Sequence, residues 1–140
     1  MSITTYNSSD PFSQTYAAGY LEARLTSNDI FDFYYNLKEN TKGTYITKIA
    51  NSDFEKMKIF LNEVGRNMEN RFRNLKDLNE GDIPFWSHIL LGFVQLKGLE
   101  HGYKFHVKKN NVPEKYLSLG ELLILQADGE VPELLSKLFF

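Results

Sequence analysis

Apolar side chains recur at every third or fourth position through most of this sequence, and that spacing is typical of amphipathic helices. The pattern predicts helices over residues 14–25, 30–37, 53–78, 84–102 and 119–126. One short stretch, residues 103–108, instead alternates apolar and polar side chains, which is the period of a strand. We therefore expect a mainly α chain with little sheet of its own.

Polar residues indicate where two of these helices begin. Ser52 with Glu55, and Ser118 with Glu121, have the spacing of a capping box, in which each side chain accepts a hydrogen bond from the backbone amide of the other residue. The helix after Ser52 is predicted to run for about 26 residues. A short loop joins it to the helix that begins at Pro84, so we expect these two helices to lie antiparallel.

The first helical region carries two local signals. Gly19 lies inside the helix, where glycine costs about 1 kcal/mol relative to alanine, and this indicates close packing against another element. Thr26 and Ser27 follow, and their hydroxyls can cap a second helix whose first turn contains Asp29. The apolar face of the first helix is predicted to consist of Tyr16, Ala17, Tyr20, Leu21 and Leu25.

The composition excludes several classes of protein. The 140 residues have the length of one domain, so we treat residues 1–140 as a single unit. The 16 basic and 18 acidic side chains give a formal net charge of -2, which argues against a nucleic-acid partner. The chain has no cysteine, and therefore no disulfide, thiolate metal site or cysteine nucleophile. No apolar run approaches the roughly 18 residues of a transmembrane segment. Residues 1–5 lack the layout of a signal peptide, so the chain is either not secreted or already processed.

The titratable side chains do not form a pattern typical of catalysis or metal binding. His88 and His101 are nearly four helical turns apart, and His106 adds no metal-ligand spacing, so we predict no metal site. Lys104 and Lys108 share one side of the predicted strand with His106. A solvated charged face explains them more simply than contact with an anionic lipid headgroup.

Three segments, in this order, carry a resemblance to a known family. They are residues 16–23 (Tyr-Ala-Ala-Gly-Tyr-Leu-Glu-Ala), residues 84–88 (Pro-Phe-Trp-Ser-His) leading into 95–103, and residues 119–126. Together they resemble the phospholipase B-like family of N-terminal-nucleophile hydrolases. One departure is Ala23, where the family commonly has glycine.

The resemblance implies a fold and an activity. Members of this family form a four-layer αββα sandwich and cleave their own precursor, which exposes a cysteine at the N-terminus of the larger, downstream fragment. That cysteine attacks an acyl carbonyl, with its own α-amine as the base. This chain resembles the smaller upstream fragment, a helical subunit with no catalytic residue of its own. Its implied partner is the larger fragment, its implied substrate is lipid-like, and its implied location is lysosomal or secreted. No cofactor is implied.

Four residues are candidates for particular roles. Tyr34, Tyr35 and Trp86 are candidates for the wall of an acyl-binding pocket, although packing in a core also explains them. Asn7 begins the triplet Asn-Ser-Ser, which is an acceptor pattern for N-linked sugar. The alternative to a small hydrolase subunit is a free-standing all-α protein-interaction module, in which helices 53–78 and 84–102 form a partner groove.

Overall fold

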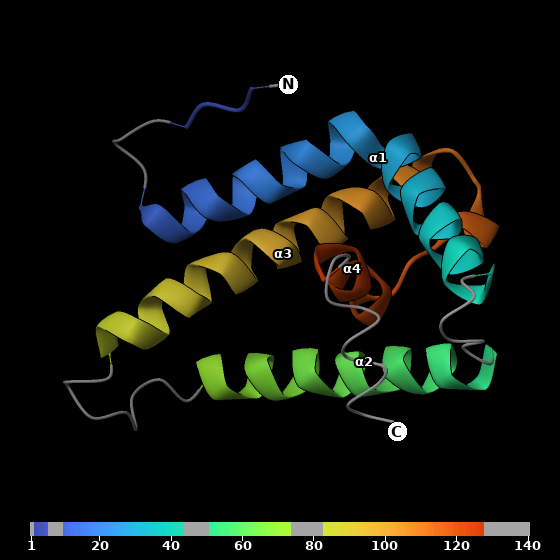
Figure 1. Cartoon of the computed structure of the whole chain (residues 1–140). Helices are drawn as coiled ribbons and strands as arrows, with labels where there is room; N and C mark the ends of the chain where they lie inside the picture. The colour runs from blue at the N-terminus through green and yellow to red at the C-terminus, as the bar shows by residue number, and fades with distance from the viewer. Residues whose placement is uncertain (1, 6–9, 44–50, 74–82, 128–140) are drawn as a thin grey trace. The chain divides into compact units, whose positions relative to one another are not determined.

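A computed structural model describes residues 2–5, 10–43, 51–73 and 83–127 of the chain. Four α-helices occupy most of this length: α1 over Pro11–Gly43, α2 over Asn51–Arg73, α3 over Ile83–Lys109 and α4 over Leu119–Gln126 (Figure 1). A 3-10 turn, η3, covers Pro113–Lys115. Within these described ranges there is no β-strand, so the expectation of a mainly α chain is confirmed.

Helix α1 begins earlier than the hydrophobic pattern predicts. Pro11 is its first residue, and Asp10 precedes it as the cap. The backbone amide of Ser13 donates to Asp10 Oδ1 at 3.0 Å, and the Ser13 hydroxyl donates to Asp10 Oδ2. These hydrogen bonds lower the pKa of the Asp10 carboxyl below its ordinary value. Proline suits the first helical position because its missing N–H would have no partner there.

The boundary predicted near Thr26 is a kink within α1. Thr26 has φ -120° and ψ 16°, which are not helical angles. Its hydroxyl donates to the carbonyl of Glu22 at 2.7 Å, and the Ser27 hydroxyl donates to the carbonyl of Ala23. These hydroxyls therefore bond back to the preceding turn in place of the expected capping of a new helix. Such back-bonding is known to bend helices.

The strand predicted over residues 103–108 is wrong, because these residues form the last turns of α3. Leu99, Tyr103 and Val107 are all buried, and their spacing of four places them on one helical face. The Tyr103 hydroxyl donates to the carbonyl of Lys115 at 2.6 Å, which ties this face to the turn that follows the helix. The alternation of apolar and polar residues was too short to distinguish the two periods.

The described residues belong to two compact units. The first contains Met1–Ser27 and Arg66–Tyr116, and the second contains Asn28–Gly65 and Leu117–Phe140. The core of the first unit consists of Ala23, Leu96, Leu99, Tyr103 and Val107, and that of the second of Tyr34, Met57, Leu117, Leu119, Leu122 and Ile124. That residues 1–140 act as a single domain stays a prediction, as does the antiparallel arrangement of α2 and α3.

In the first unit, α1 and α3 lie side by side with their backbones in contact (Figure 1). A Cβ atom added to Gly19 would lie 2.0 Å from the carbonyl oxygen of Gln95. One added to Gly98 would lie 2.1 Å from the carbonyl oxygen of Tyr16. The interpretation of Gly19 as a close-packing site is confirmed.

The packed face of α1 differs from the predicted one. Gly19, Ala23 and Ser27 are the buried positions of this helix in the first unit. Leu21 and Leu25 were expected to be inside, but they are 47% and 63% exposed. The prediction failed because it ranked residues by hydrophobicity, whereas small residues make the contact that brings the two helices together.

In the second unit, the capping box at the start of α4 is confirmed. Glu121 N donates to Ser118 Oγ at 3.3 Å, and Ser118 N donates to Glu121 Oε2 at 2.6 Å. Gly120 N donates to Asn62 Oδ1 of α2 at 2.8 Å, so the start of α4 is also bound to α2. The side chain of Ser52, and the predicted helix end at residue 78, lie outside what the structure describes.

Candidate functional site

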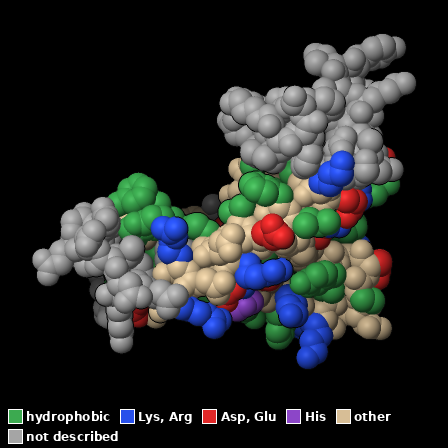
Figure 2. All heavy atoms as spheres, turned by 90° about the horizontal axis from the view of Figure 1, so that it is seen from below, with side chains coloured by type: hydrophobic (Ala, Val, Ile, Leu, Met, Phe, Trp, Pro, Cys, Tyr) green, Lys and Arg blue, Asp and Glu red, His purple; other side chains and the backbone are tan. Residues whose placement is uncertain are grey.

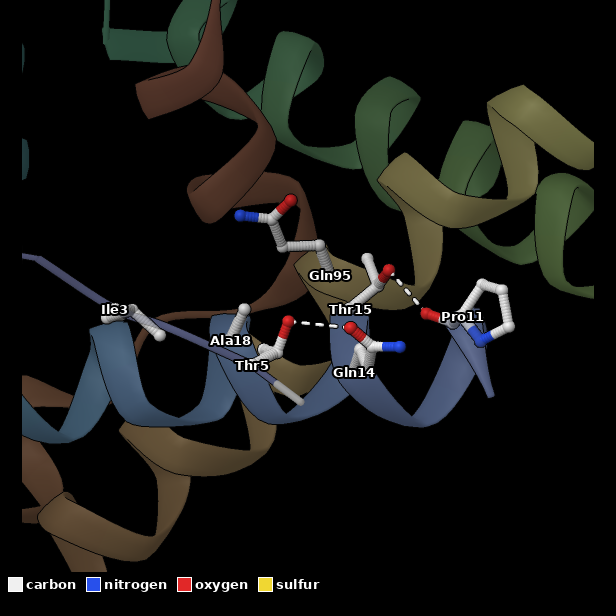
Figure 3. A pocket seen from close by; sticks show the side chains of 7 residues that line it. All are labelled: Ile3, Thr5, Pro11, Gln14, Thr15, Ala18 and Gln95. Atoms are coloured by element: carbon white, nitrogen blue, oxygen red, sulfur yellow. Dashed lines mark hydrogen bonds between the residues drawn. The ribbon is translucent and has the colours of Figure 1, made fainter. Parts of the chain in front are cut away.

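A pocket of about 450 Å³ opens in the first unit (Figure 3). Its lining comes from the N-terminal segment, the first two turns of α1 and one residue of α3; it consists of Ile3, Thr5, Pro11, Gln14, Thr15, Ala18 and Gln95. The Thr5 hydroxyl donates to Gln14 Oε1 at 2.7 Å, and the Thr15 hydroxyl donates to the carbonyl of Pro11 at 2.7 Å. These bonds orient the side chains that line the pocket.

The chemistry of this pocket suits binding better than catalysis. Its lining offers amides, hydroxyls and methyl groups, and none of the lining side chains is ionisable. General acid–base catalysis needs a titratable group within hydrogen-bond reach of the reacting atoms. The pocket can therefore hold a neutral polar or apolar group, but its own side chains cannot move a proton at neutral pH.

The three aromatic candidates occupy different environments. Tyr34 is buried in the second unit, where Tyr35 is 54% exposed and stacks on Phe31 with ring centres 6.5 Å apart. Trp86 belongs to the first unit, where the Arg71 guanidinium lies 4.9 Å from its ring centre. None of the three lines the pocket of Figure 3. Their role in an acyl-binding pocket stays a prediction.

Tyr34 belongs to a polar cluster in the second unit. Its hydroxyl donates to Glu121 Oε1 at 2.9 Å, and Lys58 Nζ lies 4.0 Å from the same oxygen. Lys58 also pairs with Glu55 at 2.5 Å. Burial raises the pKa of the Tyr34 hydroxyl well above its ordinary range, and the charge of Glu121 raises it further. Because this hydroxyl stays protonated, it acts as a hydrogen-bond donor that fixes α4, and it is unsuited to be a base.

The sequence singled out neither Lys58 of this cluster nor Asn62, which lies beside it on α2. The Asn62 side chain accepts a hydrogen bond from Gly120 N at 2.8 Å, and its Nδ2 lies 3.5 Å from Ser118 Oγ. The start of α4 is thus held by its own capping box and by α2 together. Nothing in the local pattern around Asn62 indicates a partner 58 residues away.

The three histidines do not form a common site. His101 Nδ1 lies 2.8 Å from the hydroxyl of Tyr16, and the two rings meet edge to face with centres 5.8 Å apart. His106 Nδ1 lies 3.2 Å from Nδ2 of Asn110, and His88 is exposed. Among the described residues, no group of three His, Cys, Asp or Glu side chains is arranged to hold a metal ion. The site of Asn7 lies outside the described residues.

None of the described helices is both long enough and apolar enough to cross a lipid bilayer.

One protein family matches nearly the full length of this sequence. The family model described as Phospholipase B matches residues 1–139. No solved structure matches the chain.

Individual relatives agree with this match. Phospholipase B-like protein B of Dictyostelium discoideum is 27% identical over 138 residues, which are 97% of this chain and 21% of that protein. A phospholipase B-like 2 protein of Mus musculus is 33% identical over 121 residues, or 86% of this chain and 19% of that protein. The corresponding protein of Homo sapiens is 30% identical over 123 residues. The chain thus spans about a fifth of the length of the curated relatives that it matches.

Proposed function

Because this chain belongs to the phospholipase B family, we propose that it is the non-catalytic small subunit of a hydrolase. The whole enzyme would cleave acyl amide or ester bonds of lipid-like substrates. The observation that carries the proposal is the family match over residues 1–139, combined with a chain that covers about a fifth of its relatives. The remaining four-fifths is where we place the reacting groups.

The absence of cysteine from this sequence bears on where the proposed nucleophile lies. These residues contain none, and in our proposal the thiol nucleophile therefore belongs to a partner polypeptide. We place that thiol on the first residue of the partner, where the free α-amine can accept its proton as it attacks the acyl carbonyl. The amine or alcohol of the substrate then leaves, and water hydrolyses the thioester that remains.

Exposed apolar side chains supply the surface for such a partner. In the described part of the chain, large hydrophobic residues that are at least 37% exposed include Phe12, Tyr16, Leu21 and Leu25 in the first unit, and Phe33, Tyr35, Ile59 and Phe60 in the second. Hydrophobic side chains also reach the surface of the face drawn in Figure 2. Exposed apolar side chains that gather into patches are typical of interaction sites, and these residues are the candidates for such a patch.

The proposal is tested on native material by intact mass and by thiol labelling. We expect a second polypeptide in equal amount, with cysteine as its first residue. Iodoacetamide should abolish hydrolysis of a fluorogenic acyl amide, and the added mass should lie on the second polypeptide, because this chain has no thiol. Heat-denatured protein with the same label is the control for nonspecific alkylation.

Two outcomes would contradict the proposal. A solitary monomer that is folded and has no companion chain would favour the free-standing interaction module. Hydrolysis that survives complete alkylation would exclude the cysteine mechanism.

The proposed lysosomal or secreted location has its own test, since a glycosidase should then reduce the mass of the peptide that contains Asn7.

A further inference from the structure

The last two turns of α3 and the neighbouring part of α1 form a basic patch, which we define as Arg24, Lys104, Phe105, Lys108 and Lys109. All five residues belong to the first unit. The Arg24 guanidinium lies 4.4 Å from the centre of the Phe105 ring, so the two helices contribute to one surface. The Phe105 side chain is 46% exposed, and the three lysines are exposed. Tyr103 and Val107 are buried, so the patch occupies the outward side of α3.

The cations of the basic patch form no ion pair with a described carboxylate. Among the described residues, no carboxylate lies within 4.0 Å of Arg24 or of the three lysines. Other cations of the chain have such partners, as Lys97 does with Glu100 and Arg73 with Glu69. Residues 101–115 contain four lysines and one glutamate, although the whole chain has a formal charge of -2. The positive charge is therefore concentrated at one end of α3.

The exposed Phe105 ring beside the cations favours an anionic lipid surface over a soluble anion as the partner of the basic patch. A soluble anion would be bound by the cations alone and would leave the Phe105 ring in water. At the surface of an anionic bilayer, lysines contact the headgroups while an aromatic ring enters the boundary with the acyl chains. The Arg24 guanidinium shields only one face of the ring, and 46% of this side chain remains exposed.

We propose that the basic patch docks the protein onto an anionic lipid bilayer. The lysines contact the headgroups, and the Phe105 ring lies in the interface. The proposal goes beyond the hydrolase function and does not depend on it, because docking on a surface requires neither a nucleophile nor a bond-breaking step. It differs from the sequence-based interpretation, in which Lys104 and Lys108 lay on the solvated charged face of a strand.

The test is co-sedimentation with vesicles, using the protein as purified with any polypeptide that accompanies it. Vesicles of phosphatidylcholine with about 30% phosphatidylserine are compared with pure phosphatidylcholine in about 0.1 M salt, where charges act over about 10 Å. Each basic residue near such a surface changes partitioning about fivefold. Lys104→Gln with Lys108→Gln should therefore weaken binding to the anionic vesicles about 25-fold. Phe105→Ala should weaken it severalfold.

The matched control removes the same charge from α2 through Lys56→Gln with Arg66→Gln, both of which are exposed positions. This pair should change binding less than about twofold. Far-ultraviolet circular dichroism confirms that each variant keeps its helices. Equal effects of the two pairs, or no binding of the wild-type protein to anionic vesicles, would overturn the proposal. So would unchanged vesicle binding in Phe105→Ala together with lysine-dependent binding of soluble heparin, because a polyanion would then be the partner. A sample alkylated at its thiols should still bind, which separates this test from that of the hydrolase.

Discussion

Replacing Gly98 by alanine forces α1 and α3 apart, and this change tests the packing of the first unit directly. The new Cβ would lie 2.1 Å from the carbonyl oxygen of Tyr16 and 3.0 Å from the amide nitrogen of Tyr20. Both contacts are with backbone, so no side-chain rotation can relieve them. Gly92 is the matched control on the same helix, because a Cβ atom there would meet nothing within 4 Å.

The two substitutions should change the free energy of unfolding in opposite directions. Overpacking costs about 1–3 kcal/mol, and a clash between backbones belongs at the upper end of that range. Alanine recovers about 1 kcal/mol through its higher helix propensity. The net loss for Gly98→Ala is therefore about 2 kcal/mol, or about a thirtyfold change in the folding equilibrium. Gly92→Ala should gain about 1 kcal/mol.

Urea titration measures both changes, with fluorescence of Trp86 as the probe. This is the only tryptophan of the chain, and it lies on α3 in the first unit. With a slope of about 2 kcal/mol per molar, the midpoint should fall by about 1 M for Gly98→Ala and rise by about 0.5 M for Gly92→Ala. Equal shifts in the same direction would refute the close approach of the two helices.

The remaining predictions concern the buried tyrosine and the cap of α1. Tyr34→Phe should lower the free energy of unfolding by about 1.5 kcal/mol, because it removes a hydrogen bond to the charged Glu121. Tyr35→Phe should change the free energy of unfolding by less than about 0.5 kcal/mol. Urea titration followed by circular dichroism measures the free energy of unfolding of both variants. The raised pKa of Tyr34 means that its contribution is complete below about pH 10 and decreases as the pH rises further. Wild-type protein should therefore lose more stability than Tyr34→Phe between about pH 10 and 12. Asp10→Ala should speed hydrogen exchange at the Ser13 amide, which donates to the Asp10 carboxylate. Because the pKa of Asp10 is lowered, this difference should persist down to its ordinary value of 3.8 and disappear in stronger acid.

Two structural features that depend on only a few neighbouring residues were predicted correctly from the sequence. The capping box of Ser118 and Glu121 is formed as expected, because its hydrogen bonds depend only on residues three positions apart. The interruption near Thr26 was also predicted, since small hydroxyl residues compete with helical hydrogen bonding. The direction of their hydrogen bonds was not predicted, because the same hydroxyl can cap the next helix or bond to the preceding turn.

Apart from the close packing at Gly19, the features that depend on distant partners were not predicted. The alternation at residues 103–108 fits a strand until Tyr103 and Val107 are seen to pack against other elements. Asn62 gave no local signal because its partner, Gly120, lies in another helix. The pocket near Gln95 was missed for the same reason, since its lining comes from three separate segments.

The apolar pattern of α1 is best explained by two contacts on two faces. Gly19 and Ala23 face α3, where their small size permits the close approach of the backbones. Leu21 and Leu25, on another side of the same helix, are 47% and 63% exposed. The contact with α3 is made by the small residues of α1, so it does not account for the two leucines. The proposed larger subunit gives these side chains a partner, and it also accounts for a chain that spans about a fifth of its relatives. The predicted apolar face is therefore not the face that packs on α3, and we propose it as the surface where the second polypeptide binds.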